Sequence, residues 1–314
     1  MKCRYQRYLY SWYENGKRIT TYSPVSGQRH SKDPSFHAEL VPCGRCIACR
    51  ISRAHDWAVR GSLESYCHEQ NSFITLTYDD EHLPKNLSVS KREFRLFVNR
   101  LREHIFRKYG VQVRILGSGE YGDKSARPHY HAIIFGFDFP DREPLYVANG
   151  FQYYTSPLLA KAWKFGNHII GDVNLTTINY CAKYVLKKVT GDRAKEHYGD
   201  REPEFGYYSK DPAIGRAFFE QHTSDFYPKD FITLEGKKHP IPRYFYKRLE
   251  KDFPELFSEV RYRKILKVSE EGVDLDSGEI TKDLVNAYQL NQDFDHSDKY
   301  LNHMAEKVAK KRSL

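Results

Sequence analysis

From about residue 50 onward, apolar side chains recur at the intervals expected of regular helices and strands. Apolar positions along one side of 50–70 predict a helix, and the β-branched and aromatic run at 73–78 predicts a strand. The clearest helix comes next: Ser90 can cap it, Glu93 lies at the capping-box spacing, and Gly110 can end it. Its apolar stripe consists of Phe94, Phe97, Val98, Leu101 and Ile105.

Further elements complete the order of strands and helices. Two strands are expected at about 111–117 and 129–135, and a helix opens with Ser156 as its cap and a proline at its first position. A short strand near 168–174 precedes a last helix at about 177–189. Apart from the first helix, the order is strand, helix, strand, strand, helix, strand, helix. It predicts an α+β fold, a ferredoxin-like sandwich whose central, mainly antiparallel sheet is covered by helices.

The two ends of the chain lack this regularity and are expected to extend the core. Residues 1–42 are polar, tyrosine-rich and turn-prone. Residues 191–246 are rich in glycine, proline, tyrosine and charge, and are expected to wrap the core as loops. We therefore predict a cysteine-containing extension over 1–50, a core over 51–190 and a C-terminal extension over 191–314.

Composition and charge suggest a partner. The 314 residues carry a formal net charge of +9, and 15% of them are aromatic. Basic side chains neutralise phosphates with release of counterions, and aromatic rings stack on unpaired bases, so a single-stranded nucleic acid is one expected partner. The alternative is a basic soluble protein without a nucleic-acid role. The lysine-rich, helix-compatible segment 306–312 is either a solvated tail or a DNA contact.

No part of the chain predicts a membrane protein. The apolar runs fall short of the roughly 18 uninterrupted residues that a membrane span requires. The first residues also lack the apolar stretch of a secretory signal, so a cytosolic protein is expected.

Two histidines and a glutamate form a candidate metal site. His129 and His131 alternate with Tyr130 along a predicted strand, so both imidazoles project to one face and the tyrosine to the other. A turn-like segment at 121–128 separates them from Glu120, and a hairpin there would bring the carboxylate beside the imidazoles. This ligand set leaves positions for water and a phosphate oxygen, and suits Mn²⁺ or Mg²⁺ better than a closed zinc site. A His-x-His pattern alone is more often structural.

Two tyrosines form a candidate nucleophile pair. Tyr180 and Tyr184 lie one turn apart on the last predicted helix, opposite its apolar stripe. A phenol, with a pKa of about 10, needs help to attack a phosphodiester, and flanking cations can stabilise the charge that develops on the phosphate. The flanking cations are Lys183, Lys187 and Lys188. A chain with 24 tyrosines also contains such pairs by chance, and others, such as Tyr207 with Tyr208, are interpreted as packing or DNA-stacking residues.

Three of the six cysteines crowd into seven residues, namely Cys43, Cys46 and Cys49. This spacing indicates a metal-binding knuckle rather than a disulfide framework. A tetrahedral zinc site needs a fourth ligand, which Cys3, His55 or Cys67 could supply. Cys3 is favoured because it would staple the polar N-terminal segment onto the core. The same spacing suits an iron–sulfur cluster, or the thiols could stay reduced and unliganded.

These motifs resemble those of the HUH endonucleases, a superfamily named for a His-hydrophobe-His strand like that at 129–131. The paired tyrosines, with Lys183 between them, look like those of two-tyrosine replication initiators of small single-stranded DNA phages. A narrower likeness to gokushovirus-type Microviridae initiators covers roughly 40–250 of the chain. The blocks that carry it include 42–50, 57–60, 119–122 and 127–131. Tyr130 departs from the usual aliphatic residue, but it is expected to face away from the metal.

The resemblance implies a metal-dependent DNA-nicking enzyme that starts rolling-circle replication of a phage. Tyrosine attack at the plus-strand origin would leave a 5′-phosphotyrosine and a free 3′-hydroxyl, and the second tyrosine would serve in rejoining the strands. The implied nucleophiles are Tyr180 and Tyr184, and the implied metal ligands are His129, His131 and Glu120. We also assign Lys183 and Lys187 to catalysis, and Lys188 and Arg127 to DNA binding.

The expected partner is single-stranded viral origin DNA, in the cytoplasm of a bacterial host cell. The sequence has no phosphate-binding Gly-x-x-x-x-Gly-Lys-Ser/Thr motif, so a host helicase and replisome are expected to unwind double-stranded intermediates. One alternative is an HUH relaxase or transposase, which the paired tyrosines and the cysteine block disfavour. Another is a non-catalytic, zinc-stapled DNA-binding protein, which predicts no covalent adduct.

Overall fold

The structure is a computed structural model that describes residues 3, 5–123, 125–189, 193–227 and 231–260. The basic segment 306–312, with all of the predicted C-terminal extension after residue 260, lies outside these residues. The chain divides into two compact units, one of residues up to Arg53 and one that starts at Ala54.

The first unit holds a three-stranded antiparallel sheet in the order β2-β1-β3 and a short helix α1 (Pro24–Arg29). Its strands are β1 (Arg7–Glu14), β2 (Lys17–Thr21) and β3 (His37–Val41). Asn15 and Gly16 join β1 to β2 with φ angles of 51° and 74°, the left-handed backbone that two-residue hairpin turns require. Our sequence analysis noted only turns here, although Asn-Gly between two polar, β-compatible runs is a hairpin signal.

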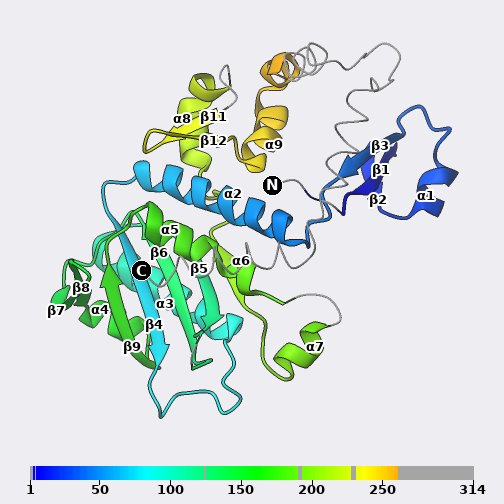
Figure 1. Ribbon diagram of the computed structural model, residues 1–314. Coiled ribbons are helices and arrows are strands. Elements are labelled where there is room, and N and C mark those ends of the chain that lie inside the picture. Colours follow the sequence, from blue (N-terminus) through cyan, green and yellow to red (C-terminus); the bar gives the residue numbers. More distant parts are fainter. Residues whose placement is uncertain (1–2, 4, 124, 190–192, 228–230, 261–314) are drawn as a thin grey trace. The chain divides into compact units, whose positions relative to one another are not determined.

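The second unit is built on a seven-stranded antiparallel sheet in the order β10-β5-β6-β4-β9-β8-β7 (Figure 1). Its strands are β4 (Asn71–Tyr78), β5 (Arg114–Tyr121), β6 (Pro128–Phe135), β7 (Glu143–Ala148), β8 (Phe151–Thr155), β9 (Gly166–Gly171) and β10 (Phe205–Tyr208). Helices α3 (Lys91–Tyr109) and α4 (Pro157–Ala162) connect the four central strands. Strand β6 lies between β4 and β5, as in ferredoxin-like folds. The predicted fold class is therefore confirmed, while the β7–β8 hairpin was not predicted.

Helix α3 begins and ends where the sequence predicts. The Ser90 hydroxyl accepts a hydrogen bond from the Glu93 amide at 3.2 Å, and Gly110 ends the helix with a φ of 69°. The buried side chains of this helix are Phe94, Phe97, Val98, Leu101 and Ile105. Because all five belong to the main core, this one stripe fixes how α3 lies on the sheet.

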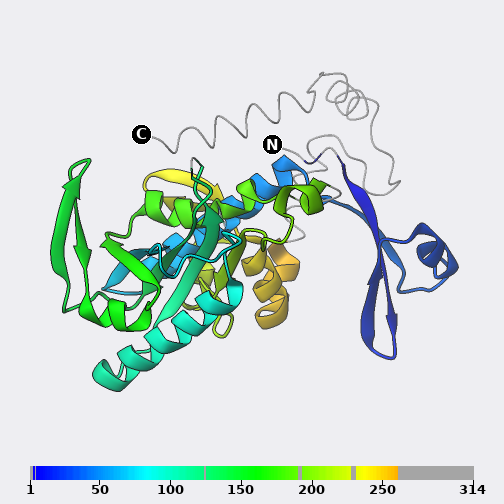
Figure 2. The ribbon, with the colours of Figure 1, turned by 90° about the horizontal axis from the view of Figure 1, so that it is seen from below.

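Helices cover both faces of the sheet, and Figure 2 shows α3 on one side and α5 (Leu175–Ala182) on the other. The main core lies between the sheet and helices α3 and α4. On the opposite face, Ile178 of α5 packs with Leu116 and Ile133 of the sheet. Helix α2 (Ile47–Tyr66) lies over the same face, and a Cβ on its Gly61 would come within 2.8 Å of Ile178. A glycine there lets α2 approach α5 closely.

The segment 191–246 is not the set of loops that we expected. Its described residues form helices α7 (Arg193–Tyr198), α8 (Arg216–Phe226) and α9, which begins at Arg243, with strands β10, β11 (Phe231–Leu234) and β12 (Lys237–Pro240). Phe219, Ile232 and Phe245 pack against Val59 and Leu63 of α2 and form a separate core. The loop prediction was wrong because these elements are short and strongly charged, so periodicity hides them, and α2 supplies part of their apolar surface.

The helix expected over 177–189 is also interrupted. It forms α5 and a short α6 (Tyr184–Lys187), and the Lys183 amide donates to both the Asn179 and Tyr180 carbonyl oxygens where α5 ends. The next turn is tighter, because the Leu186 amide donates to the Lys183 oxygen three residues back. None of the helices among the described residues is long and apolar enough to cross a membrane.

Candidate active site

Strands β5 and β6 pair directly and carry the three candidate metal ligands on one face of the sheet. Their register places Glu120 opposite His129, and His131 lies two residues further along β6. Glu120 Oε1 lies 3.5 Å from His131 Nε2 and 3.9 Å from His129 Nε2. Glu120 and His131 are buried and His129 is half-buried. The three ligand atoms lie within 4.8 Å of one another, so they fit one divalent ion and leave its other positions open.

Hydrogen bonds orient both imidazoles toward that position. His129 Nδ1 donates to the carbonyl oxygen of Arg127 at 3.1 Å, which leaves Nε2 with a lone pair. Thr75 lies opposite His131 on the neighbouring strand β4, and its Oγ1 is 3.0 Å from His131 Nδ1. Partners of this kind fix the ring orientation of a metal-binding histidine. Our sequence analysis did not identify Thr75, because only the strand order brings it here.

Lys187 lies beside the metal ligands. Its Nζ is 2.9 Å from Glu120 Oε2 and 2.9 Å from Asp123 Oδ1. The ammonium group therefore compensates the charge of the buried Glu120 carboxylate and ties it to the β5–β6 turn. Sequence analysis placed Lys187 beside the tyrosines, and did not identify Asp123.

Tyr130 faces the other side of the sheet, as its place in the strand predicts. Its side chain is fully buried, and its hydroxyl accepts a hydrogen bond from the Ser90 amide at 2.8 Å and lies 2.8 Å from the hydroxyl of Tyr78. Burial raises the pKa of Tyr130 well above that of a free tyrosine. The tyrosine thus anchors the strand that carries the two histidines to the start of α3, without touching the metal ligands.

Helix α5 brings Tyr180 to the histidines. The helix starts with a capping box in which Asn174 and Thr177 exchange hydrogen bonds between side chains and backbone. The Tyr180 ring meets the His131 ring edge-on, with 4.6 Å between centroids and an interplanar angle of 86°. One candidate nucleophile is therefore in direct contact with a candidate metal ligand.

Tyr184 follows the helix break and has a different environment. Its hydroxyl lies 2.7 Å from that of Tyr208 on the edge strand β10, with Tyr208 as the donor. Tyr208 in turn stacks flat on Trp57 of α2, at 3.6 Å between centroids. Sequence analysis interpreted Tyr208 as a packing or DNA-stacking residue. The structure places it within hydrogen-bonding distance of a candidate nucleophile.

Gly206 provides the space in which these two hydroxyls meet. A Cβ at this position would clash with the hydroxyls of both Tyr184 and Tyr208. Position 206 pairs with Ser118 of β5, so the glycine belongs to the same sheet as the metal ligands. A residue without a side chain is thus required for this arrangement of the second tyrosine.

The remaining predicted cations have separate positions. Lys183 and Lys188 are half-buried at either end of α6. Arg127 donates to the carbonyl oxygen of Tyr78 at 2.8 Å and pairs with Asp80 at the same distance. Arg127 therefore also holds the β5–β6 turn against the end of β4.

The four predicted cysteines come together in the first unit. All four sulfurs lie within 4.8 Å of one another, and all four cysteines are free of disulfides. Cys46 Sγ lies 3.7 Å from that of Cys3 and 3.5 Å from that of Cys49, while Cys43 and Cys49 are 4.0 Å apart. Backbone amides of Cys43 and Cys46 donate to cysteine sulfurs. The other candidates for a fourth ligand interact elsewhere: His55 with His239, and Cys67 with the carbonyl oxygen of Leu63.

The four thiols differ in acidity. Burial favours the neutral form of Cys43, but the amides of Cys46 and Arg45 outweigh it and lower the pKa of this thiol to about 6. Burial raises the pKa of Cys46 and of Cys49 above that of a free cysteine. Four thiolates could therefore coexist here only with a compensating cation.

Comparison with known proteins gives consistent matches. Residues 71–189 match the family model described as replication-associated protein ORF2. The chain is 37% identical over 251 residues to the replication-associated protein VP4 of Bdellovibrio phage phiMH2K, which covers 78% of each chain. It is 32% identical over 230 residues to the replication-associated protein ORF2 of Spiroplasma virus 4, which covers 70% of each. The replication-associated protein ORF4 of Chlamydia phage 1 is 35% identical over 233 residues, 72% of this chain and 57% of that protein. No solved structure matches.

Proposed function

The chain belongs to the family of replication-associated proteins of the ORF2 type, and we propose that it initiates rolling-circle replication of a single-stranded DNA phage by cutting the viral strand with a tyrosine. The observation that carries this proposal is the contact of Tyr180 with His131, inside a cluster of two histidines and a glutamate. A protein that only binds DNA has no need of a phenol next to a divalent-metal site.

The proposed metal is Mn²⁺ or Mg²⁺, held by Glu120, His129 and His131. Two imidazole nitrogens and one carboxylate oxygen within 4.8 Å of one another fit such an ion. When bound, it would polarise the scissile phosphate and stabilise negative charge in the transition state. Lys187 would keep the Glu120 carboxylate ionised and in place.

In the proposed first reaction, the Tyr180 oxygen attacks the scissile phosphate. The bond between that oxygen and phosphorus forms, the bond from phosphorus to the 3′ oxygen breaks, and the phenol proton ends on the 3′ oxygen. The products are a 5′-phosphotyrosine and a free 3′-hydroxyl, which a polymerase can extend. The half-buried Lys183 and Lys188 would supply positive charge near the phosphates.

Tyr184 would act in the second reaction. It would cut the regenerated origin in the same way, and the new 3′-hydroxyl would then attack the phosphotyrosine at position 180. That attack joins the two DNA ends and returns the proton to Tyr180, so no external energy source is required. We propose that the strand transfer takes place in the infected bacterium and that a host helicase unwinds the duplex.

Replacing Tyr208 with Phe tests whether this residue positions Tyr184. The variant retains the ring that stacks on Trp57 and loses the hydroxyl that bonds to Tyr184. We expect strand transfer to slow by about 2- to 10-fold, the effect of one lost hydrogen bond, with the first cleavage unchanged. The measurement is the rate of joined product relative to the rate of covalent adduct. Tyr207→Phe, one residue away on the opposite face of β10, is the control, and an equal effect there would contradict the assignment.

For the cysteine cluster we propose a structural Zn²⁺. Tetrahedral zinc with Zn–S bonds of about 2.3 Å requires sulfurs about 3.8 Å apart. The observed separations of 3.5, 3.7 and 4.0 Å support this geometry. A [4Fe–4S] cluster would need the sulfurs further apart, because each cysteine binds a different iron atom. Four thiolates fill the coordination shell, so this ion would stabilise the fold and take no part in the reaction.

Zinc analysis tests this second metal site. Protein purified without chelators is expected to contain about one zinc per chain, and Cys46→Ser is expected to lose it and to melt at a lower temperature. Cys67→Ser, outside the cluster, should retain the metal and serves as the control. A wild-type protein that contains no zinc and melts at the same temperature with and without added zinc would contradict the proposal.

A further inference from the structure

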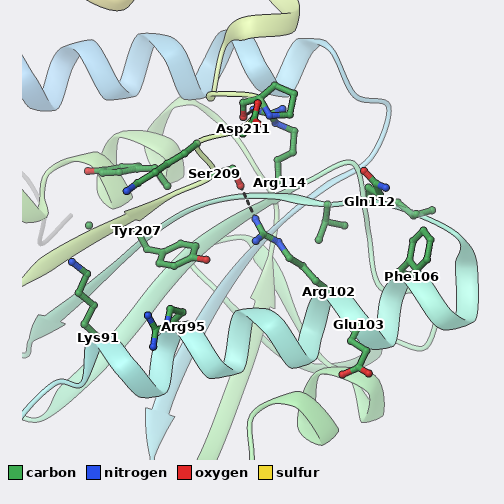
Figure 3. A pocket seen from close by; sticks show the side chains of 16 residues that line it. Lys91, Arg95, Arg102, Glu103, Phe106, Gln112, Arg114, Tyr207, Ser209 and Asp211 are labelled. Atoms are coloured by element: carbon green, nitrogen blue, oxygen red, sulfur yellow. Dashed lines mark hydrogen bonds between the residues drawn. The ribbon is translucent and has the colours of Figure 1, made fainter.

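A large cleft lies beside the edge strand β10, on the face of the sheet opposite the metal ligands. Its volume is about 1060 Å³, and it lies between α3 and the segment 206–212 (Figure 3). This volume is at the upper end of the roughly 300–1,000 Å³ typical of small-molecule pockets. The cleft therefore has room for more than a small ligand.

Cations dominate the cleft. Lys91 and Arg95 on the first turns of α3 and Lys210 after β10 are exposed, and each lines it. Arg102 also lines the cleft and donates to the Ser209 hydroxyl at 2.8 Å, the contact drawn in Figure 3. The acidic Glu103 on the wall is paired with Arg107, which reduces its effect. The cleft thus favours an anionic ligand.

Aromatic rings accompany these cations. The Phe106 side chain lines the cleft although it is 54% exposed, an unusual exposure for a phenylalanine. Tyr207 is half-buried, with its ring edge-on to Phe94 at 5.5 Å. Basic side chains for phosphates together with aromatic rings for unpaired bases are the combination found in single-strand binding grooves.

The cleft reaches the second candidate nucleophile through β10. Side chains alternate along a strand, so Tyr207 faces the cleft while Tyr208 turns to the other face, where its hydroxyl meets that of Tyr184. Gly206 and Tyr208 line the cleft as well, although both contact the Tyr184 hydroxyl. Strand β10 is at the edge of the sheet, so only one strand separates the cleft from the candidate active site.

We propose that this cleft binds single-stranded DNA that flanks the scissile phosphate, and that it guides the strand around the β10 edge toward Tyr184. The inference rests on the proposed function, because it assumes that the tyrosines cut a single strand. It adds a DNA path on the face of the sheet that carries none of the candidate catalytic residues. Lys91 and Arg95 would contact phosphates, and Phe106 would stack on a base.

The test compares binding and cleavage of two oligonucleotides, a short one centred on the origin cut and one extended by about ten nucleotides on each side. For K91A/R95A we expect at least about 10-fold weaker binding of the extended strand, measured by fluorescence anisotropy. The salt dependence of that binding should fall by about 1.4 in slope, because each lost phosphate contact removes about 0.7 for single strands. Phe106→Gln should weaken binding about 5- to 10-fold without changing the slope, because stacking is not ionic.

The matched control is K247A/K251A, which removes the same charge from exposed positions on α9 (Arg243–Asp252). It should leave the affinity for the extended strand within about 2-fold of wild type. Binding by K91A/R95A equal to that of wild type, or an equal loss in the α9 control, would overturn the proposal.

Cleavage separates this inference from the proposed function. The cleft variants should form covalent adduct on the short oligonucleotide at the wild-type rate, and show a raised KM with unchanged kcat on the extended one. If wild-type protein forms no adduct, the proposed function fails while the binding measurement still reports on the cleft. If adduct forms normally and the cleft variants bind the extended strand as wild type does, only the cleft assignment fails.

Discussion

Replacing Tyr180 and Tyr184 together with Phe should abolish the covalent protein–DNA adduct while leaving DNA binding and the fold intact. The double variant loses only two hydroxyls, and it retains both rings, including the edge-on contact with His131. Loss of a covalent nucleophile should reduce adduct formation by on the order of 10³-fold or more. The measurement is a denaturing gel of protein incubated with Mn²⁺ and a labelled single-stranded origin. A full yield of adduct from the double variant would show that another residue attacks.

The single variants should differ, because the two tyrosines have different surroundings. Tyr180 contacts a metal ligand, whereas Tyr184 bonds to Tyr208 on the edge strand. We therefore expect Tyr180→Phe to lose most of the first cleavage, and Tyr184→Phe to form the first adduct normally but fail to complete strand transfer. Equal defects in both reactions would mean that the tyrosines are interchangeable. If wild-type protein forms no adduct with any divalent metal, the non-catalytic DNA-binding interpretation gains support.

Replacing Glu120 with Gln should have the second largest effect. The substitution keeps the size of the side chain and removes the negative charge that would hold the divalent ion with the two histidines. Loss of this ligand should lower adduct formation at about 1 mM Mn²⁺ by roughly 10²- to 10³-fold, since metal ions contribute several kcal/mol to such transition states. Lys187 keeps its partner Asp123, so the melting temperature should fall only moderately.

The decisive readout for Glu120→Gln is the Mn²⁺ titration of adduct formation. The variant should need a much higher metal concentration for half-maximal rate. Glu220→Gln, an exposed acid that pairs with Arg216 on α8, is the matched control and should titrate as wild type does. If Glu120→Gln retained the wild-type titration curve, the carboxylate would not be a ligand, and the site would have to be assigned without it.

The sequence predicted those parts of the molecule whose signals are local. Ser90 and Gly110 mark the ends of α3 by their own backbone chemistry, and alternation along β6 places His129 and His131 on one face whatever surrounds the strand. The order of strands and helices was sufficient for the fold class. Glu120 could be placed because the turn between β5 and β6 is short, so the partner strand had to return beside it.

The parts that could not be predicted depend on contacts between distant segments. Tyr208 lies on a strand of four residues, and nothing in its neighbourhood along the chain indicates that it pairs with Tyr184. Thr75 contacts His131 only because β4 lies next to β6. The core around Phe219 and Phe245 is divided between α2 and elements that follow residue 215, so neither part shows a complete apolar face.

Gly206 links the mechanism of this protein to its evolution. Any side chain there would occupy the space in which the hydroxyls of Tyr184 and Tyr208 meet. A mutation at this single position would thus displace the second tyrosine without altering either tyrosine codon, and leave an enzyme able to cut but impaired in closing the circle. A lineage that depends on two nucleophiles is therefore constrained at a residue that takes no part in the chemistry.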